Sequence, residues 1–471
     1  MTLLVLCTLF IMLSLGIILI SKENYLRAYT VFAVAIFHLG LTIYLLNTSV
    51  LMMDALSKLI LITLSILYLG ISFHGIGYFS KCQFTNDNKI VTLSLVVFIV
   101  FATLMVIANE LISMWIFLET ASLACTPLIY YNKNKASIEA TWKYLFLCSI
   151  GIVLALIGML FISYSAIIAG ANDTSLTFTN ILSNDKYFNP TWLKISFVFM
   201  FIGFATKTGL FPLHSWKADA YSVEPGIFGA LMAGGVTSLS WLALMRLIQI
   251  MNAAGESVLV HTILIFFGII SILFASIAML NQLDIKKVLA YSSIEHMGII
   301  ALGLGVGGIG IFGALFHIFN NALLKGAIFI AVGNIRRAYG QKTTEFISGA
   351  LSKIPITGTL FLIAFLAVVG TPPFGSFFSM FSILQGVLAH SPLVSLLFML
   401  GLILAFMGMG KTFLGASRGK PPMVETGYKD TIEMYLTPLL FLSIILIIGL
   451  SMPDVFKQLI MDAAALLEGN L

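Results

Sequence analysis

Long apolar runs recur along the whole of this chain, and they limit how it can fold more than any other feature. We predict about fourteen of them, each long enough to cross roughly 30 Å of hydrocarbon as a helix. Because backbone N–H and C=O groups find no water inside a bilayer, we expect an all-α polytopic membrane protein. The predicted spans are about 2–20, 26–46, 53–79, 90–107, 111–131, 143–168, 191–213, 227–250, 259–281, 287–306, 309–333, 355–388, 393–416 and 432–451.

Composition and cysteine spacing exclude several other classes of protein. Of the 471 residues, 59% are hydrophobic and 10% are charged, which leaves too little polar surface for a water-soluble protein of this size. The cysteines argue against a zinc site, an iron–sulfur cluster and a disulfide framework, because Cys7, Cys82, Cys125 and Cys148 lie far apart without CxxC spacing. The net charge is +5, and no basic block with interleaved aromatic residues suggests nucleic acid. We expect no metal, no cofactor and no nucleic-acid partner.

Cationic residues gather in alternate connections between the predicted spans. The odd-numbered connections contain Lys22, Arg27, Lys81, Lys89, Lys133, Lys135, Lys217, Lys286, Lys287, Arg336, Arg337, Lys342, Lys353, Lys411, Arg418, Lys420 and Lys429. The even-numbered connections contain few cations, apart from the mixed loop at 171–194. Since lysine and arginine favour the cytoplasmic side, we expect the odd connections there and both termini on the outer side.

Ionisable side chains also lie inside the predicted spans. They are Glu119, Lys143, Lys207, His317 and Lys325, with Glu295 and His296 nearer one end of their span. A charge at the centre of a bilayer is unfavourable, so such residues face protein or water and usually have a task. A carboxylate and an amine on neighbouring helices form a pair whose pKa values respond to each other, as a proton relay requires. We interpret Glu119 and Lys207 as this pair, whereas Lys143 is equally compatible with a side chain that reaches the membrane surface.

Prolines interrupt two of the predicted helices within or near the membrane. Pro212 follows Lys207 in the seventh span, and Pro372 and Pro373 lie in the twelfth. Proline removes a backbone donor and breaks the helical hydrogen-bond ladder. The breaks are five spans apart, which fits two five-helix repeats, the second inserted inverted. The predicted divisions are a three-helix segment at 1–89, repeats at 90–250 and 259–416, and a last span with an amphipathic tail at 417–471.

The chain resembles a known family in five motifs: MWIFLETASL, KTGLFPLHSW, DIKKVLAYSSIEHMGI, HIFNNALLKGAIF and GTPPFGSFFS. They are similar to the antiporter-like proton-translocating subunits of respiratory complex I, membrane-bound group 4 hydrogenases and Mrp-type sodium/proton antiporters. The similarity covers about residues 53–415 and is greatest to component F of hydrogenase-4 and formate hydrogenlyase-like complexes. It implies fourteen helices in a prokaryotic cytoplasmic (inner) membrane.

The resemblance also implies roles for particular residues. Glu119 matches the fifth-helix glutamate and Lys207 the seventh-helix lysine, whose changing separation is thought to push a proton along a polar axis in the membrane plane. His317 and Lys325 match an eleventh-helix polar pair that continues this axis.

One motif of the family is altered in this chain. His214 and Asp219 fall in a loop that usually reads HSWLPDAH and here reads HSWKADAY. Lys217 and Ala218 replace the leucine and proline, so we expect a different local backbone.

Three further departures concern the later part of the axis. Ser238 stands where many members of the family have an eighth-helix lysine. Met380 stands where they have Glu or Lys after the second break. Asn321 stands where the family tripeptide Asn-His-Ala would place a histidine. Methionine cannot carry a proton. Three interpretations remain open: water or another subunit completes the route, protons leave near Lys325, or the chain transmits conformation without pumping.

The leading functional hypothesis is a proton- or sodium-translocating subunit of a multisubunit respiratory oxidoreductase, most like a group 4 hydrogenase. With no redox centre expected in this chain, electron chemistry belongs to partners: other membrane subunits and a peripheral redox arm. One alternative is the membrane subunit of an inorganic-carbon uptake complex with a soluble zinc-containing partner. Another is a scaffold subunit that does not pump.

Overall fold

The computed structural model describes residues 2–48, 53–80, 85–171, 174–183, 188–341, 343, 346–421 and 428–468. Within these ranges the chain is helical, with two isolated β-bridges, Glu110–Thr177 and Asp284–Thr343. The expectation of an all-α chain is therefore confirmed for this part. Cys82, with the loop residues Lys81 and Lys342, lies outside the described residues.

Eleven helical segments in the described ranges are long and apolar enough to cross a membrane. They are α2 (Asn24–Asn47), α3 (Ala55–Ser80), α4 (Thr85–Ile107), α5 (Leu111–Ala124) with α6 (Thr126–Tyr130), α7 (Lys135–Ile168), α11 (Gly226–Leu231) continued by the π-helix Met232–Val236 and α12 (Thr237–Ala253), α13 (Ser257–Met279), α14 (Ile285–Val306), α15 (Ile309–Tyr339), α19 (Pro392–Ser417) and α20 (Ile432–Leu450). Each coincides with one of the predicted spans.

The remaining helices are shorter or interrupted. They are α1 (Thr2–Ile20), α8 (Phe178–Ser183), α9 (Pro190–Thr208), α10 (Ser215–Val223), α16 (Ala350–Lys353), α17 (Pro355–Val368), α18 (Gly375–His390) and α21 (Asp454–Glu468). The helix α9 occupies the seventh predicted span and α10 begins just after it, whereas α17 and α18 together occupy the twelfth.

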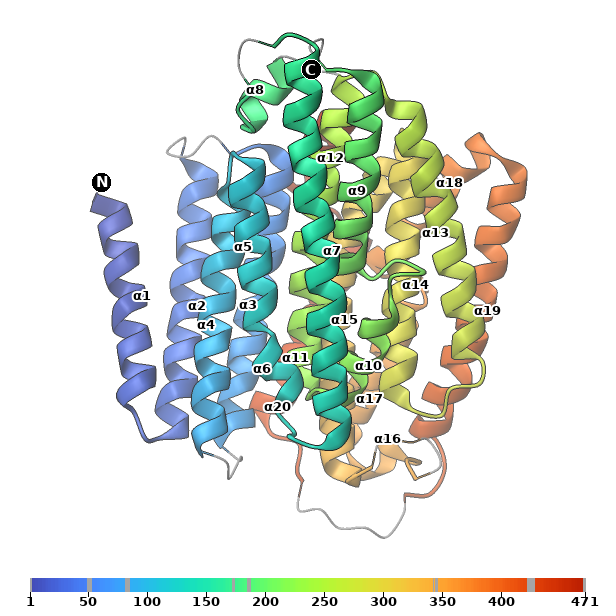
Figure 1. The fold of residues 1–471 in the computed structure, drawn as a ribbon. Coiled ribbons are helices and arrows are strands. Elements are labelled where there is room, and N and C mark those ends of the chain that lie inside the picture. The colour runs from blue at the N-terminus through green and yellow to red at the C-terminus, as the bar shows by residue number, and fades with distance from the viewer. Residues whose placement is uncertain are drawn as a thin grey trace.

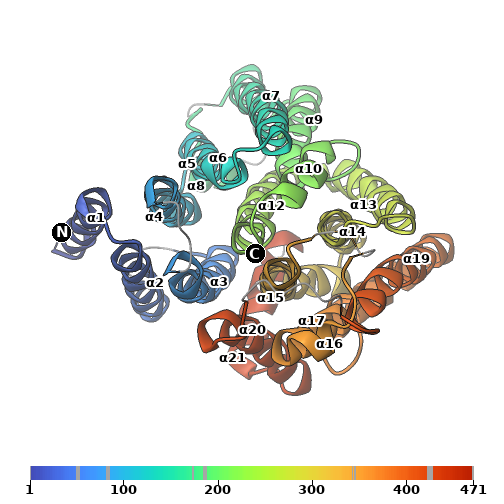
Figure 2. The same ribbon diagram turned by 90° about the horizontal axis from the view of Figure 1, so that it is seen from below.

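The long helices stand side by side in one bundle, with α1 at one edge and α19 at the other (Figure 1). Seen along the bundle, α12, α14 and α15 lie at its centre (Figure 2). In their most apolar 18-residue stretches, α15 and the segment of α11 and α12 have 100% of their residues buried, and α14 has 94%. The corresponding share is 39% for α7, α13 and α19. Polar residues on the central helices therefore face protein, which agrees with how membrane proteins place costly side chains.

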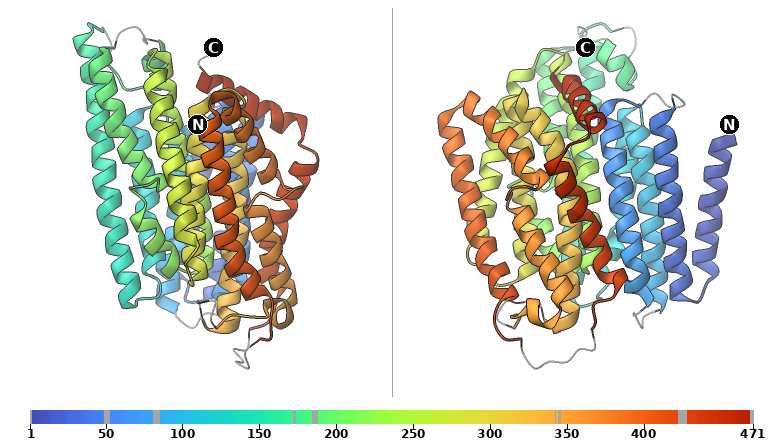
Figure 3. Two further views of the ribbon diagram at one scale, coloured as in Figure 1. Left: turned by 90° about the vertical axis from the view of Figure 1, so that its right-hand side faces the viewer. Right: turned by 180° about the vertical axis from the view of Figure 1, so that it is seen from behind.

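Both described ends of the chain lie at the same end of the bundle, opposite α16 (Figures 1 and 3). The last helix, α21, buries Ile460, Ala463 and Leu467, whose spacing puts them on one helical face. Side-chain amides of α12 hold it: Asn252 Nδ2 donates to the carbonyl of Leu467 at 2.6 Å. The tail that we predicted to be amphipathic contains this helix, Asp454–Glu468, which has one buried face.

The first helix break separates α9 from α10. Gly209 adopts a left-handed conformation (φ 78°) that ends α9, and Pro212 follows with no N–H to continue the ladder. Carbonyls freed by the break accept bonds from side chains of α10: Trp216 Nε1 donates to Thr206 O at 2.8 Å, and Lys217 Nζ to Thr208 O at 2.6 Å. The exposed backbone is thus satisfied inside the protein, as a membrane requires.

The second break, between α17 and α18, is built in the same way. Gly370 is left-handed (φ 75°), and Pro373 follows it by the same interval at which Pro212 follows Gly209. Ser376 Oγ, from the second half of the helix, donates to Ala367 O at 2.6 Å. The predicted interruptions of the seventh and twelfth spans are confirmed.

Candidate functional site

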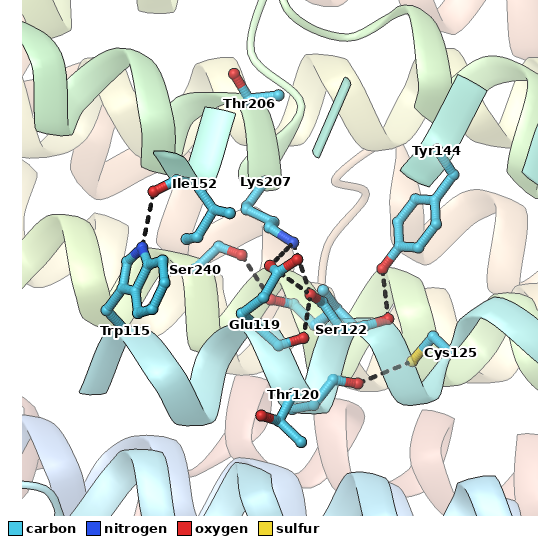
Figure 4. A network of polar contacts seen from close by, with 12 residues as sticks. Trp115, Glu119, Thr120, Ser122, Cys125, Tyr144, Ile152, Thr206, Lys207 and Ser240 are labelled. Atoms are coloured by element: carbon cyan, nitrogen blue, oxygen red, sulfur yellow. Dashed lines mark hydrogen bonds and ion pairs between the residues drawn. The ribbon is translucent and has the colours of Figure 1, made fainter. Parts of the chain in front are cut away.

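Glu119 on α5 and Lys207 on α9 form a contact inside the protein. Lys207, in the last turn of α9, donates from Nζ to Glu119 Oε2 on α5 at 2.6 Å and to Ser122 Oγ at 2.6 Å (Figure 4). The Lys207 side chain is 1% exposed and that of Glu119 is 16% exposed. Removing one member of such a buried pair leaves an uncompensated charge, which costs about 3–5 kcal/mol. The predicted contact between these two residues is thus present in the fold.

Neighbouring side chains fix the geometry of this pair. Ser122 Oγ donates to Glu119 O at 2.8 Å and lies 3.2 Å from Glu119 Oε2, so it bridges the acid and the amine. Tyr144 on α7 donates its hydroxyl to Ser122 O at 2.7 Å. Trp115 Nε1 donates to Ile152 O at 2.7 Å, which ties α5 to α7 (Figure 4).

Lys217 corrects a sequence-based expectation. We expected it in a cytoplasmic connection, but it lies on α10, is 0% exposed, and donates to Thr208 O within the first break. The predicted loop HSWKADAY is largely helix, because the chain resumes a helix at Ser215. A second buried amine therefore lies inside the protein, ten residues after Lys207. Its position next to a proline break was the sequence feature that could have indicated its burial.

Polar residues continue from α14 through α15 to α18. Lys325 Nζ on α15 donates to Ser292 Oγ on α14 at 2.7 Å. His296 Nδ1 lies 2.8 Å from His317 Nε2, and His317 Nδ1 lies 2.8 Å from Ser379 Oγ on α18. We call this line of buried groups, from Glu119 through Lys207, Lys217 and Lys325 to Ser379, the polar axis.

Hydrogen-bond directions at the far end of the polar axis follow from Ser379. Its hydroxyl donates to Ser376 O at 2.9 Å, so it accepts from Nδ1 of His317. A neutral His317 then accepts at Nε2 from Nδ1 of His296. Hydrogen bonds therefore run without a gap from His296 on α14 through His317 on α15 to Ser379 on α18.

Glu295 lies in the middle of α14, not near its end as expected, because that helix runs over 22 residues from Ile285 to Val306. It is 4% exposed and lines a cavity of about 10 Å³ together with Met380 and the end of α17. Such a space holds about one water molecule. A carboxylate therefore faces the position where the sequence has a methionine.

Three other predicted residues lie nearer the surface of the bundle. Lys143 is two turns inside α7, 45% exposed, and its Nζ lies 2.8 Å from both Glu139 Oε1 and Asp219 Oδ2. It therefore reaches towards the surface and fastens α7 to α10. His214 lies in the break and packs against Phe274, at 4.6 Å between ring centroids, and its Nδ1 has no hydrogen-bond partner in the described part of the chain.

Glu224 is a buried acid that sequence reasoning missed. It is 0% exposed at the end of α10, and neither carboxylate oxygen has a hydrogen-bond partner among the residues that the structure describes. Lys286, which we expected in a surface loop, is 1% exposed and donates to the backbone carbonyl of Glu224. The signal for Glu224 was the proline that follows it, which marks the turn between α10 and α11.

The departures from the family pattern have clear local consequences. Ser238 Oγ donates to Gly234 O of its own helix at 2.6 Å, directly after the π-helix. Asn321 is 3% exposed, and its Oδ1 has no hydrogen-bond partner in the described part. Neither of these side chains titrates, so the polar axis passes from Lys217 to Lys325 without an ionisable group on α12 at Ser238.

Comparisons with known proteins place this fold in a family. Residues 108–408 match the family described as "NADH:quinone oxidoreductase/Mrp antiporter, TM". The chain is 34% identical over 316 residues to a hydrogenase-4 component F homolog of Methylacidiphilum infernorum, covering 67% of this chain and 66% of that protein. It is 33% identical over 282 residues to NADH-quinone oxidoreductase subunit N of Desulforudis audaxviator, covering 59% and 55%. The chain thus spans about half to two thirds of the curated relatives that it matches.

The fold agrees with these matches. A chain of the membrane-bound sulfane sulfur reductase, an archaeal respiratory membrane complex, superposes with a TM-score of 0.84 at 20% identity, covering 98% of this chain and 96% of that one. Sequence identity at this level shows the fold alone. Together with the match over residues 108–408, it shows that this chain belongs to the NADH:quinone oxidoreductase/Mrp antiporter transmembrane family.

Proposed function

We propose that this chain is an ion-translocating, antiporter-like membrane subunit of a multisubunit respiratory oxidoreductase, and that it moves protons or sodium ions along the polar axis. The observation that carries the proposal is the buried contact between Lys207 and Glu119 at a helix break. An acid and an amine in contact, away from bulk water, exchange a proton when the field around them changes. The similarity to a hydrogenase-4 component F homolog supports a group 4 hydrogenase or formate hydrogenlyase-like complex.

The full architecture that we propose has fourteen transmembrane helices. The eleven segments described above are joined by α1, by α9 with α10, and by α17 with α18. The matching glycine and proline positions at the two breaks support inverted five-helix repeats at 90–250 and 259–416, flanked by segments 1–89 and 417–471. The cationic connections at one end of the bundle support a cytoplasmic location for that end in a prokaryotic inner membrane, with both termini outside.

Glu295 bears on the competing interpretations. A methionine at position 380 favours a proton path that ends on a partner, as in an inorganic-carbon uptake complex with a soluble zinc-containing subunit. It is equally compatible with a scaffold that does not transport ions. Because Glu295 faces the same small cavity as Met380, an ionisable group is available at the second break. This supports a complete path within the chain, with the zinc-partner and scaffold functions as alternatives.

Proton translocation by membrane vesicles tests the proposal. Vesicles that contain the complete complex are energised, and pH changes are followed with a dye in the wild type, Glu119→Gln and Lys207→Ala. Thr120→Ala is the matched control, because Thr120 is partly exposed and its side-chain hydroxyl bonds within its own helix. We expect translocation to fall about 100-fold in the first two variants and to persist in the control. Wild-type transport in Glu119→Gln and Lys207→Ala would refute the proposal and favour a scaffold.

A further inference from the structure

A polar cavity of about 260 Å³ lies at the end of the bundle opposite the termini, apart from the polar axis. Its walls come from α3, the α6–α7 connection, the start of α11 and the last turns of α15, which meet at this end (Figures 1 and 2). The polar side chains that line it are His74, Tyr78, Asn132, Asn334, Arg336 and Arg337. No carboxylate from the described residues lines the cavity, so the charges on its walls are those of the two arginines.

The two arginines of the cavity lack acidic partners among the residues that the structure describes. Arg337 stacks over the ring of Tyr78, with its guanidinium carbon 4.8 Å from the ring centroid. Its Nη1 atom is buried and has no hydrogen-bond partner in the described part of the chain. Neither Arg336 nor Arg337 forms an ion pair with a described acidic side chain. A buried guanidinium donor without an acceptor is unfavourable, and an oxyanion in the cavity would relieve this.

The chemistry of the walls selects among possible occupants. Two guanidinium groups lining one cavity repel protons and metal cations, so the cavity is unsuited to be an entrance for the transported ion. Guanidinium forks and amide donors suit a multi-oxygen anion, above all phosphate. The cavity lies where α15 ends at Tyr339, which is the level of lipid head groups for a helix that crosses the membrane.

We propose that this cavity binds a phosphate group, carried by the head group of an anionic phospholipid or by a free phosphate. Basic pockets between transmembrane helices on the cytoplasmic side are a known type of site for anionic head groups. The bound phosphate would bridge α3, α11 and α15, and so join the N-terminal segment to the central helices. The inference does not depend on ion translocation, because it rests on the cavity and its unpaired donors.

Binding to the purified full chain, with whatever subunits accompany it, tests this site. Native mass spectrometry and thermal unfolding are measured with added phosphatidylglycerol, with phosphatidylcholine, and with inorganic phosphate. The variants are Arg336→Gln, whose side chain has no described partner, and Arg337→Gln. Arg418→Gln is the matched control, because Arg418 is an exposed cation at the same end of the bundle and does not line the cavity.

We expect one phosphate ligand per chain, bound about tenfold more weakly by Arg336→Gln and by Arg337→Gln but unchanged by Arg418→Gln. Preference for phosphatidylglycerol over inorganic phosphate identifies a lipid site, and an equal response to inorganic phosphate identifies a free-phosphate site. The inference is overturned if neither phosphate source binds, or if binding survives both cavity substitutions. Equal loss in Arg418→Gln would also overturn it, since it would indicate nonspecific attraction to a basic surface.

Discussion

Lys207 and Glu119 are 88 residues apart in the sequence, yet their charged atoms lie 2.6 Å apart in the fold. The contact requires α9 to end where it does, since Gly209 and Pro212 place Lys207 in its last turn. A cation at a helix C-terminus is favoured by the helix dipole, so the break helps to hold the ammonium group. The Lys207 amine therefore interacts both with the Glu119 carboxylate and with the C-terminal end of α9. A change in either is expected to alter the protonation of Lys207.

Lys217 is also expected to be needed for transport. We predict that Lys217→Met lowers ion translocation by at least about tenfold, because it removes the only described amine between Lys207 and Lys325 along the polar axis. The methionine fills a similar volume, so the fold is expected to persist. Dye-based transport in vesicles measures the effect, and unchanged translocation would remove Lys217 from the axis. Lys287→Met, a partly exposed lysine on α14, is the control.

The two histidines give a prediction for the far end of the axis. We expect His317→Phe to reduce translocation about 100-fold, because His317 joins His296 to Ser379 through both of its ring nitrogens. Ser379→Ala keeps the two rings in contact and is expected to have a smaller effect. Transport rates of the two variants, measured at equal amounts of assembled protein, decide the point. Equal rates in His317→Phe and the wild type would show that protons bypass this pair.

Glu295 and Met380 allow a test in which the carboxylate is moved from position 295 to position 380. Since both line the same cavity of about 10 Å³, a carboxylate attached to either side occupies nearly the same place. We predict that Glu295→Gln abolishes translocation and that adding Met380→Glu restores a measurable part of it. Met380→Gln in the same background is the control, because it adds a polar but non-titrating group. If Met380→Glu and Met380→Gln behave alike, the cavity does not need an ionisable carboxylate.

A second ion pair is expected to matter for stability alone. Arg246 on α12 binds both carboxylate oxygens of Asp54, at the start of α3, and also Ser57 Oγ at 2.8 Å. We predict that Arg246→Ala destabilises the protein by about 3 kcal/mol, seen as a lower Tm in detergent, because it leaves a partly buried carboxylate unpaired. Lys194→Ala, which breaks the more exposed Lys194–Glu256 pair, is expected to cost less than about 1 kcal/mol. Similar losses in the two variants would contradict this difference.

The sequence is sufficient to predict those features that local physics decides. The apolar runs are long and Pro212 and Pro373 are strong breakers, so the spans and both interruptions follow from residues close together in the chain. The contact between Glu119 and Lys207 was also predictable, because an isolated charge in a membrane needs a partner.

Other features depend on packing that a linear pattern does not contain. A lysine just after a break looks the same whether the chain leaves the membrane or begins a second helix, so Lys217 was assigned to a connection. Lys286 was misplaced for a similar reason, since its partner is a backbone carbonyl far away in the sequence, at Glu224. That Glu295 faces Met380 depends on how α14 and α18 are rotated, which no spacing within either helix determines.

The most direct test of the account is proton translocation by vesicles that contain the complete complex with Glu119→Gln, compared with Thr120→Ala. The substitution removes the acid's titration while keeping its size and its ability to accept a bond from Lys207. The account predicts that translocation falls about 100-fold in Glu119→Gln and is unchanged in Thr120→Ala. Translocation at the wild-type rate in Glu119→Gln would contradict it.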